Sequence, residues 1–188
     1  MKYEVAITFT SRGLNGQYGM AAYGGCGQWT ATPKNLSKAS YLICVRNRRR
    51  GHEEWAEEDL PHGQAFILAK VTGVAEAPRS NPAKKQRYIV LFEEYTEIEV
   101  PDAWRKCTGG QAFPVAYRSR DDIEAALGID FDDPSFEWKR LSDLQDDHAY
   151  GPEKALDTSH SLTVEQAKQG LATHFGVSPE QIDIQVNF

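Results

Sequence analysis

The chain has 188 residues, a formal net charge of −6 and 40% hydrophobic residues. This length suits one well-buried core with a small appendage. No apolar run approaches the length of a membrane span, and the first residues lack the apolar segment of a secretory signal, so we expect no membrane association. The acidic balance does not favour nucleic acid, so binding of that kind requires a local basic face.

The chain holds Cys26, Cys44 and Cys107, an odd number without a close pair. This pattern argues against a disulfide framework and predicts a reducing, cytoplasmic location. A metal site built from Cys44, His52 and His62 would lack a fourth ligand and the usual close spacing. We therefore expect neither a metal nor another cofactor.

Apolar and alternating runs predict a domain built mainly from strands. The run at 93–100 alternates polar with apolar side chains, which indicates a strand with one face in water. Pro114 cannot donate to a ladder and therefore indicates an edge strand. The expected strands are residues 2–10, 41–45, 65–76, 88–92, 93–100 and 111–117.

Two further segments have distinct patterns. Ser119 is expected to cap a short helix at 120–127, because acidic side chains follow it and Gly128 ends the run. Residues 13–28 are rich in glycine and are expected to form a long surface loop or a lid over a ligand.

The C-terminal part predicts a separate small unit. Residues 146–160 contain turn formers and few apolar side chains, which indicates a linker after a main domain at 1–145. A capping box at Thr163 and Gln166 and a later alternating run, 182–186, predict a helix followed by a strand. Residues 161–188 are too short to fold alone, so we expect them to dock on the main domain or on a protein partner.

Four short motifs carry a family resemblance. They are residues 45–47 (Val-Arg-Asn), 73–76 (Gly-Val-Ala-Glu), 87–90 (Arg-Tyr-Ile-Val) and 114–115 (Pro-Val). Their order resembles the PUA-like superfamily, closest to its EVE and ASCH branches, over roughly residues 40–141. The resemblance implies an α+β fold on a small mixed β-barrel. It also implies non-catalytic binding of RNA or of modified bases in DNA, often within defence or restriction systems.

Arg46 and Asn47 are the first candidates for a binding site. A guanidinium fork and a carboxamide at a strand end are suited to hydrogen-bond the edge of a base. The alternative is structural, with Asn47 satisfying loop backbone groups and Arg46 paired with Glu53 or Glu54.

Several aromatic side chains are candidates for stacking on a flipped or single-stranded base. They are Tyr23, Trp29 and Trp55. The alternative for each is a place in the core, where aromatic side chains are more common. Trp104 and Trp138 lie in segments whose pattern indicates packing, and both are assigned to the core.

Two basic clusters are candidates for phosphate contacts around one groove, whether the polymer is DNA or RNA. The alternative is that these are solvated loop charges neutralised by neighbouring glutamates. The clusters comprise Arg48, Arg49, Arg50, Lys84, Lys85 and Arg87.

Two functions of other classes remain open. Asp102, Glu137 and Lys139 resemble the active site of PD-(D/E)xK nucleases, in which two carboxylates hold Mg²⁺ and a lysine polarises the attacking water. A protein-interaction module is the other alternative, with residues 161–188 as the docking element and the acidic balance in its favour.

Overall fold

A computed structural model of the chain describes residues 3–16, 18–48, 60–79, 83–144, 168, 172 and 178–183. The chain divides into two units, Met1–Pro152 and Glu153–Phe188, and every strand that the structure describes lies in the first. Among these described residues, no helix is long and apolar enough to cross a membrane.

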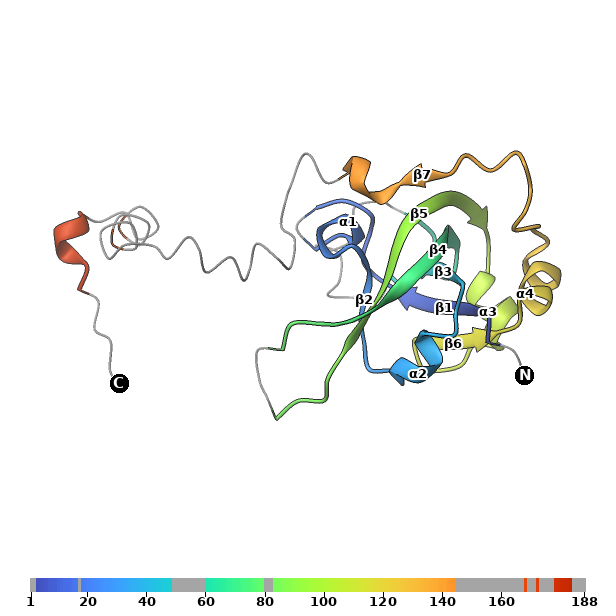
Figure 1. The fold of residues 1–188 in the computed structure, drawn as a ribbon, viewed down its shortest axis with the longest axis horizontal. Helices are drawn as coiled ribbons and strands as arrows, with labels where there is room; N and C mark the ends of the chain where they lie inside the picture. The colour runs from blue at the N-terminus through green and yellow to red at the C-terminus, as the bar shows by residue number, and fades with distance from the viewer. Residues whose placement is uncertain are drawn as a thin grey trace. The chain divides into compact units, whose positions relative to one another are not determined.

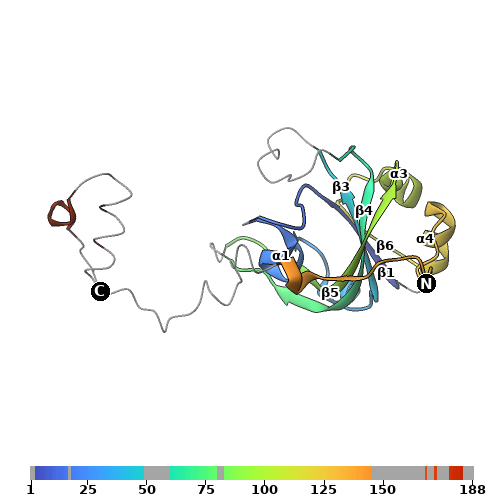
Figure 2. The same cartoon turned by 90° about the horizontal axis from the view of Figure 1, so that it is seen from above.

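The first unit is built on one curled sheet (Figures 1 and 2). Its strands are β1 (Val5–Thr10), β2 (Gly25–Trp29), β3 (Tyr41–Arg46), β4 (Ala65–Glu76), β5 (Tyr88–Val100), β6 (Val115–Arg118) and β7 (Lys139–Arg140). Their order across the sheet is β2-β5-β4-β3-β1-β6, and β7 pairs with β5. β1 and β3 are parallel, whereas the other described pairs are antiparallel. The fold is therefore α+β around a barrel-like sheet.

Short helices connect the strands, and the helix predicted at 120–127 is confirmed. The Ser119 hydroxyl accepts a hydrogen bond from the Asp122 N–H at 3.2 Å, and Gly128 ends the helix with a φ of 70°. The helices of this unit are α1 (Met20–Tyr23), α2 (Pro33–Leu36), α3 (Ala103–Thr108), α4 (Arg120–Leu127) and a 3₁₀ turn at Leu141–Leu144.

The central strands are apolar on both faces because each face is covered. On β3, Leu42 and Cys44 belong to one hydrophobic cluster, with α1 and Trp29, while Ile43 and Val45 belong to another. The second cluster includes residues of α3 and α4, which lie side by side (Figure 2). Successive side chains of a strand point to opposite faces, so one apolar run supplies both clusters.

The glycine-rich region 13–28 is not the long loop or lid that its composition predicts. It forms a turn, α1 and β2, and β2 pairs with β5. A Cβ atom on Gly25 would lie 2.2 Å from the Val90 carbonyl oxygen, and one on Gly27 would lie 2.8 Å from Cγ1 of Ile89. These glycines therefore allow β2 to pack closely on β5, which is a structural role.

The free edge of β6 is covered by side chains. The carbonyls of Pro114 and Arg118 accept hydrogen bonds from backbone N–H groups at the β1 edge, so those of Val115 and Tyr117 point away from β1. The Gln111 amide donates to the Val115 carbonyl at 2.9 Å, and Arg118 Nη1 donates to the Tyr117 carbonyl at 2.8 Å. Two outward acceptors of the edge are therefore already used.

All three cysteines are buried and carry free thiols. The Thr8 hydroxyl lies 3.4 Å from the sulfur of Cys26 and 3.6 Å from that of Cys44 in the core. Burial raises the pKa of the Cys44 thiol well above its ordinary value, and burial raises that of Cys107, on α3, to about 11. The thiols of Cys44 and Cys107 are therefore packing groups with little thiolate character near neutral pH.

The second unit is described only in part. Lys168 and Ala172 are helical, and Ser178 forms a capping box with Gln181 at the start of a short 3₁₀ helix (Pro179–Gln181). The capping box at Thr163 and Gln166, the linker at 146–160 and most of the strand at 182–186 lie outside the described residues. The domain boundaries at 145 and 161 therefore stay predictions.

Candidate nucleic-acid interface

The connector between β4 and β5 gathers positive charge on one hollow. Four exposed cations line a cavity of about 260 Å³ together with Gln28 of β2, Ala77 and Pro78. We call these four cations the cationic tip: Arg79, Lys84, Lys85 and Arg87. Figure 1 shows the connector at the end of the β4–β5 hairpin, on the side away from α3 and α4.

The backbone of the cationic tip is held by hydrogen bonds of the hairpin itself. The Ala77 N–H donates to the Arg87 carbonyl at 2.9 Å, which extends the β4–β5 ladder by one pair beyond Glu76 and Tyr88. The Gln86 amide donates to the carbonyls of Ala77 and Arg87, both at 2.9 Å. The described part of the connector is therefore anchored at its base, while its charged ends lie in solvent.

Within the part of the chain that the structure describes, no carboxylate lines this hollow and none of its four cations forms an ion pair. Arg79 Nη1 donates only a long hydrogen bond, 3.5 Å, to the Lys84 carbonyl. Four like charges close together and without counter-charges raise the local positive potential. An anion from outside would lower that repulsion.

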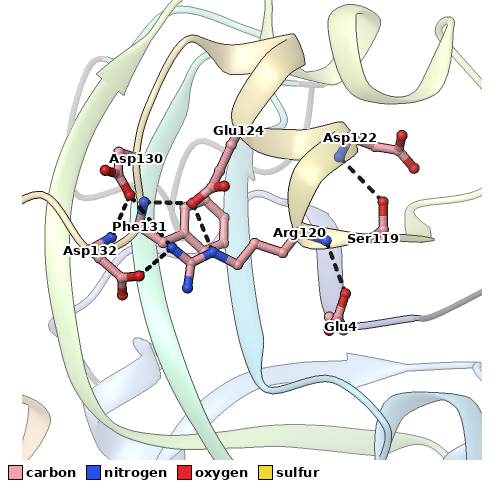
Figure 3. Close-up of polar contacts among 8 residues, drawn as sticks. All are labelled: Glu4, Ser119, Arg120, Asp122, Glu124, Asp130, Phe131 and Asp132. Atoms are coloured by element: carbon pink, nitrogen blue, oxygen red, sulfur yellow. Dashed lines mark hydrogen bonds and ion pairs between the residues drawn. The ribbon is translucent and has the colours of Figure 1, made fainter.

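Arg120 shows how the same chain neutralises a cation that has a structural role (Figure 3). Its guanidinium contacts Glu124 and Asp132 at 2.8 Å each and Asp130 at 3.5 Å. The hydrogen bonds that Arg120 donates to Asp132 and Glu124 raise the pKa of Arg120, and Glu124 also accepts the Phe131 N–H at 2.9 Å. This network attaches residues 130–132 to α4. The cationic tip has no counterpart of these carboxylates among the described residues.

Arg46 lies at the opposite end of the sheet and is completely buried. Its Nη1 donates to the Ser11 carbonyl at 2.8 Å, and its guanidinium carbon lies 4.6 Å from the centre of the Phe66 ring. It borders a hollow of about 70 Å³ that Gln64 and Glu97 also line. That room suits a few water molecules, whereas ligand pockets measure roughly 300–1,000 Å³.

Asn47 and Arg48 follow Arg46 but do not join it at this hollow. The Asn47 N–H donates to the Thr10 carbonyl at 2.7 Å, and its side-chain oxygen is buried without a hydrogen bond from the described residues. The backbone N–H of Arg48 donates to Nδ1 of His62 at 3.0 Å. Arg49, Arg50 and Trp55, also predicted as site residues, lie outside the described residues, as does His52.

The described aromatic candidates are already engaged in contacts within the fold. Trp29 is 8% exposed, lies opposite Tyr88 at the end of β2, and donates its indole N–H to the Cys26 carbonyl at 3.1 Å. Tyr23 is half-buried and lies under the Arg12 guanidinium at 4.8 Å. Trp104 is buried in the second cluster, against which Trp138 packs.

β4 separates the two predicted basic clusters. It begins at Ala65, close to Val45 and the Arg46 end, and it ends at Glu76, beside the cationic tip. A strand of 12 residues spans about 35 Å at the usual rise. Arg48 and the pair Lys84 and Lys85 therefore do not border one groove.

The three residues of the nuclease alternative are not assembled. Asp102 has a φ of 57° and begins α3 directly after β5, in a conformation that aspartate tolerates better than most residues. Lys139, on β7, pairs with Tyr95 of β5, and its Nζ contacts Glu97 at 2.7 Å. Within the described chain, no group of three carboxylate, histidine or cysteine side chains is placed to hold a metal ion.

Sequence reasoning selected Lys84, Lys85 and Arg87 but left out Arg79 and Gln28. Residues 77–87 contain four cations and no acidic residue, and that signal was sufficient to add Arg79. Gln28 could not be found in this way, because it reaches the hollow only through the pairing of β2 with β5.

Comparison of this chain with family models, with curated proteins and with solved structures gives no match. The function is therefore inferred from the chemistry of the residues themselves.

Proposed function

We propose that this protein is a non-catalytic nucleic-acid-binding protein that contacts backbone phosphates through its cationic tip. The supporting observation is that Arg79, Lys84, Lys85 and Arg87 line one hollow to which the described residues contribute no carboxylate. The net charge of the chain is −6, so this concentration of positive charge is local and not a property of the whole surface.

The physical basis is release of counterions from the nucleic acid. Each cation that neutralises a phosphate displaces a condensed counterion, so affinity falls steeply as salt rises. Lysine and arginine on a solvated hairpin lose little hydration when they meet phosphate at a surface. The negative charge elsewhere on the protein opposes binding, so we expect moderate affinity that is strongest at low salt.

Reading of a modified base by Arg46 and Asn47 has less support than phosphate binding. The hollow beside Arg46 measures about 70 Å³, and Asn47 does not line it. Trp29, proposed to stack on the base, packs at the other end of the sheet. The resemblance to PUA-like domains agrees with nucleic-acid binding in general and remains a proposal.

The test measures binding of a fluorescent oligonucleotide by anisotropy at two salt concentrations. Lys84→Gln with Lys85→Gln removes two phosphate contacts, so affinity at low salt is expected to fall by about tenfold or more. The slope of log affinity against log salt is expected to become shallower by about one for each lost contact.

The matched control is Arg105→Gln with Lys106→Gln, which removes the same charge from two exposed residues of α3. α3 follows the far end of β5, so this variant is expected to bind as the wild type does. Equal losses in both variants would indicate a net-charge effect. Absence of any binding at low salt would refute the proposed function.

A further inference from the structure

The cationic tip is notable for the absence of aromatic rings. Residues 77–87 contain no phenylalanine, tyrosine, tryptophan or histidine. The nearest rings on the adjoining strands, Trp29 and Tyr88, pack against the first hydrophobic cluster. No aromatic side chain is among the described residues that line the hollow.

The large aromatic side chains that the described residues expose lie elsewhere. Phe113 is 79% exposed and precedes β6, and Tyr18 is 45% exposed and precedes α1. Neither lines the hollow of the cationic tip. Among the residues that the structure describes, a nucleic acid held at the tip therefore meets positive charge and peptide groups without a ring on which a base could stack.

This composition discriminates between single-stranded and duplex nucleic acid. Proteins that bind single strands combine a basic groove with stacked rings, each worth about 1–3 kcal/mol per base. A site without rings gains no stacking free energy, so its affinity depends on the density of phosphate charges alone. A duplex offers about one charge per 1.7 Å of axis, twice the density of one of its strands.

The shape of the tip agrees with this preference where the duplex is B-form DNA. Ala77 and Arg87 continue the β4–β5 ladder, so the base of the tip is a two-stranded ribbon. The major groove of B-form DNA, about 12 Å wide, admits such a ribbon between two rows of phosphates. Cations on a narrow ribbon can then contact phosphates of both strands.

We infer that the cationic tip binds duplex nucleic acid in preference to single strands and contacts its backbone without stacking on bases. This inference rests on the proposed function and specifies its ligand. The phosphate chemistry is shared by DNA and RNA duplexes, so the experiment includes both.

The test is competition against a labelled DNA duplex by unlabelled DNA duplex, RNA duplex and each single strand, at equal nucleotide concentration and low salt. A duplex of DNA or of RNA is expected to compete at roughly fivefold lower concentration than its own single strands. Phe113→Ala and Tyr18→Ala are expected to leave both values unchanged, whereas Lys84→Gln with Lys85→Gln weakens duplex binding.

Single strands that compete as well as either duplex would overturn the inference and leave the proposed function standing. Loss of single-strand binding in Phe113→Ala or Tyr18→Ala would overturn it as well, because a ring would then be part of the site. A duplex affinity that is unchanged in Lys84→Gln with Lys85→Gln would also overturn it, because the duplex would then bind elsewhere on the protein. Failure of every nucleic acid to bind would instead refute the proposed function.

Discussion

The two ends of the β4–β5 hairpin differ in the environment of their basic side chains. At the end where β4 begins, Arg46 is buried, stacks on Phe66 and donates to the Ser11 carbonyl. At the other end, the cationic tip keeps its charges in solvent with no ion pair among the described residues. A basic residue is therefore a candidate for binding an external anion only when its charge is exposed and its hydrogen-bond donors are not already bound within the fold.

The two ends of the hairpin also differ in their acidic residues. Glu97 and Glu99 border the hollow near Arg46, whereas the described lining of the hollow at the cationic tip contains no carboxylate. A carboxylate within a few ångströms competes with phosphate for the same cation. The Arg46 end is therefore expected to contribute to stability, and the cationic tip to binding.

The largest expected effect is on stability at the Arg46 end. Arg46→Ala removes a buried side chain from contact with Phe66 and the Ser11 carbonyl, so the free energy of unfolding is expected to fall by about 2–5 kcal/mol. Urea denaturation monitored by circular dichroism measures this change. Duplex affinity of the folded variant is expected to stay unchanged.

Arg46→Met is the companion variant, because it keeps most of the apolar stem and removes the charge. It is expected to lose less stability than Arg46→Ala. Full stability in Arg46→Ala would show that Arg46 is not a structural cation. A weakened duplex affinity in either folded variant would place the binding site at the Arg46 end of the hairpin and contradict its assignment to the cationic tip.

The second effect is smaller and confined to alkaline pH. Cys107 lies on α3, near the Arg46 end, and burial raises its pKa to about 11 from an ordinary value of 9.0. The unfolded chain therefore releases this proton first, and the stability that the buried thiol provides is complete below pH 9 and is lost as pH rises towards 11. The loss by pH 10.5 is expected to be about 2 kcal/mol.

This loss is measured by urea denaturation of the wild type and of Cys107→Ala at pH 8 and pH 10.5. The wild type should lose more stability over this interval than the variant. Burial also raises the pKa of Tyr95 and Tyr117, but both proteins share these groups and their effect cancels. Equal losses would mean that Cys107 does not retain its proton in the folded protein.

The smallest effect is expected for the stability of the cationic tip. Lys84→Gln with Lys85→Gln breaks no ion pair of the described residues, so the free energy of unfolding should change by less than about 0.5 kcal/mol. Thermal denaturation measures this change. A loss above about 1 kcal/mol would place these lysines with Arg120, among the cations that hold the fold together.

Local patterns were sufficient to predict most elements of the sheet. The run at 65–76 coincides with β4, and Ser119 caps the helix predicted at 120–127. Residues 88–92 and 93–100 were expected as two strands but form one, because β5 is long enough to pair with β4 along its whole length. Periodicity identified the strand without locating its ends.

The arrangement of the site could not be predicted by the same means. Lys84 and Arg48 follow similar apolar strands in the sequence, but β4 carries the chain the full length of the sheet between them. The sequence did not predict β2, because Gly25 and Gly27 lack the side chains whose alternation identifies a strand. The structural role of these glycines, close packing of β2 on β5, is visible only in the folded protein. Both errors arise from contacts between residues distant in the chain.

The covered edge of β6 has a consequence for assembly. An exposed strand edge recruits strands of other molecules through its free carbonyls and N–H groups. Gln111 and Arg118 occupy the carbonyls of Val115 and Tyr117, so an incoming chain would have to displace two side chains before it could pair there. Pairing of a second strand with the edge of β6, which would extend the sheet into dimers or fibrils, is therefore disfavoured.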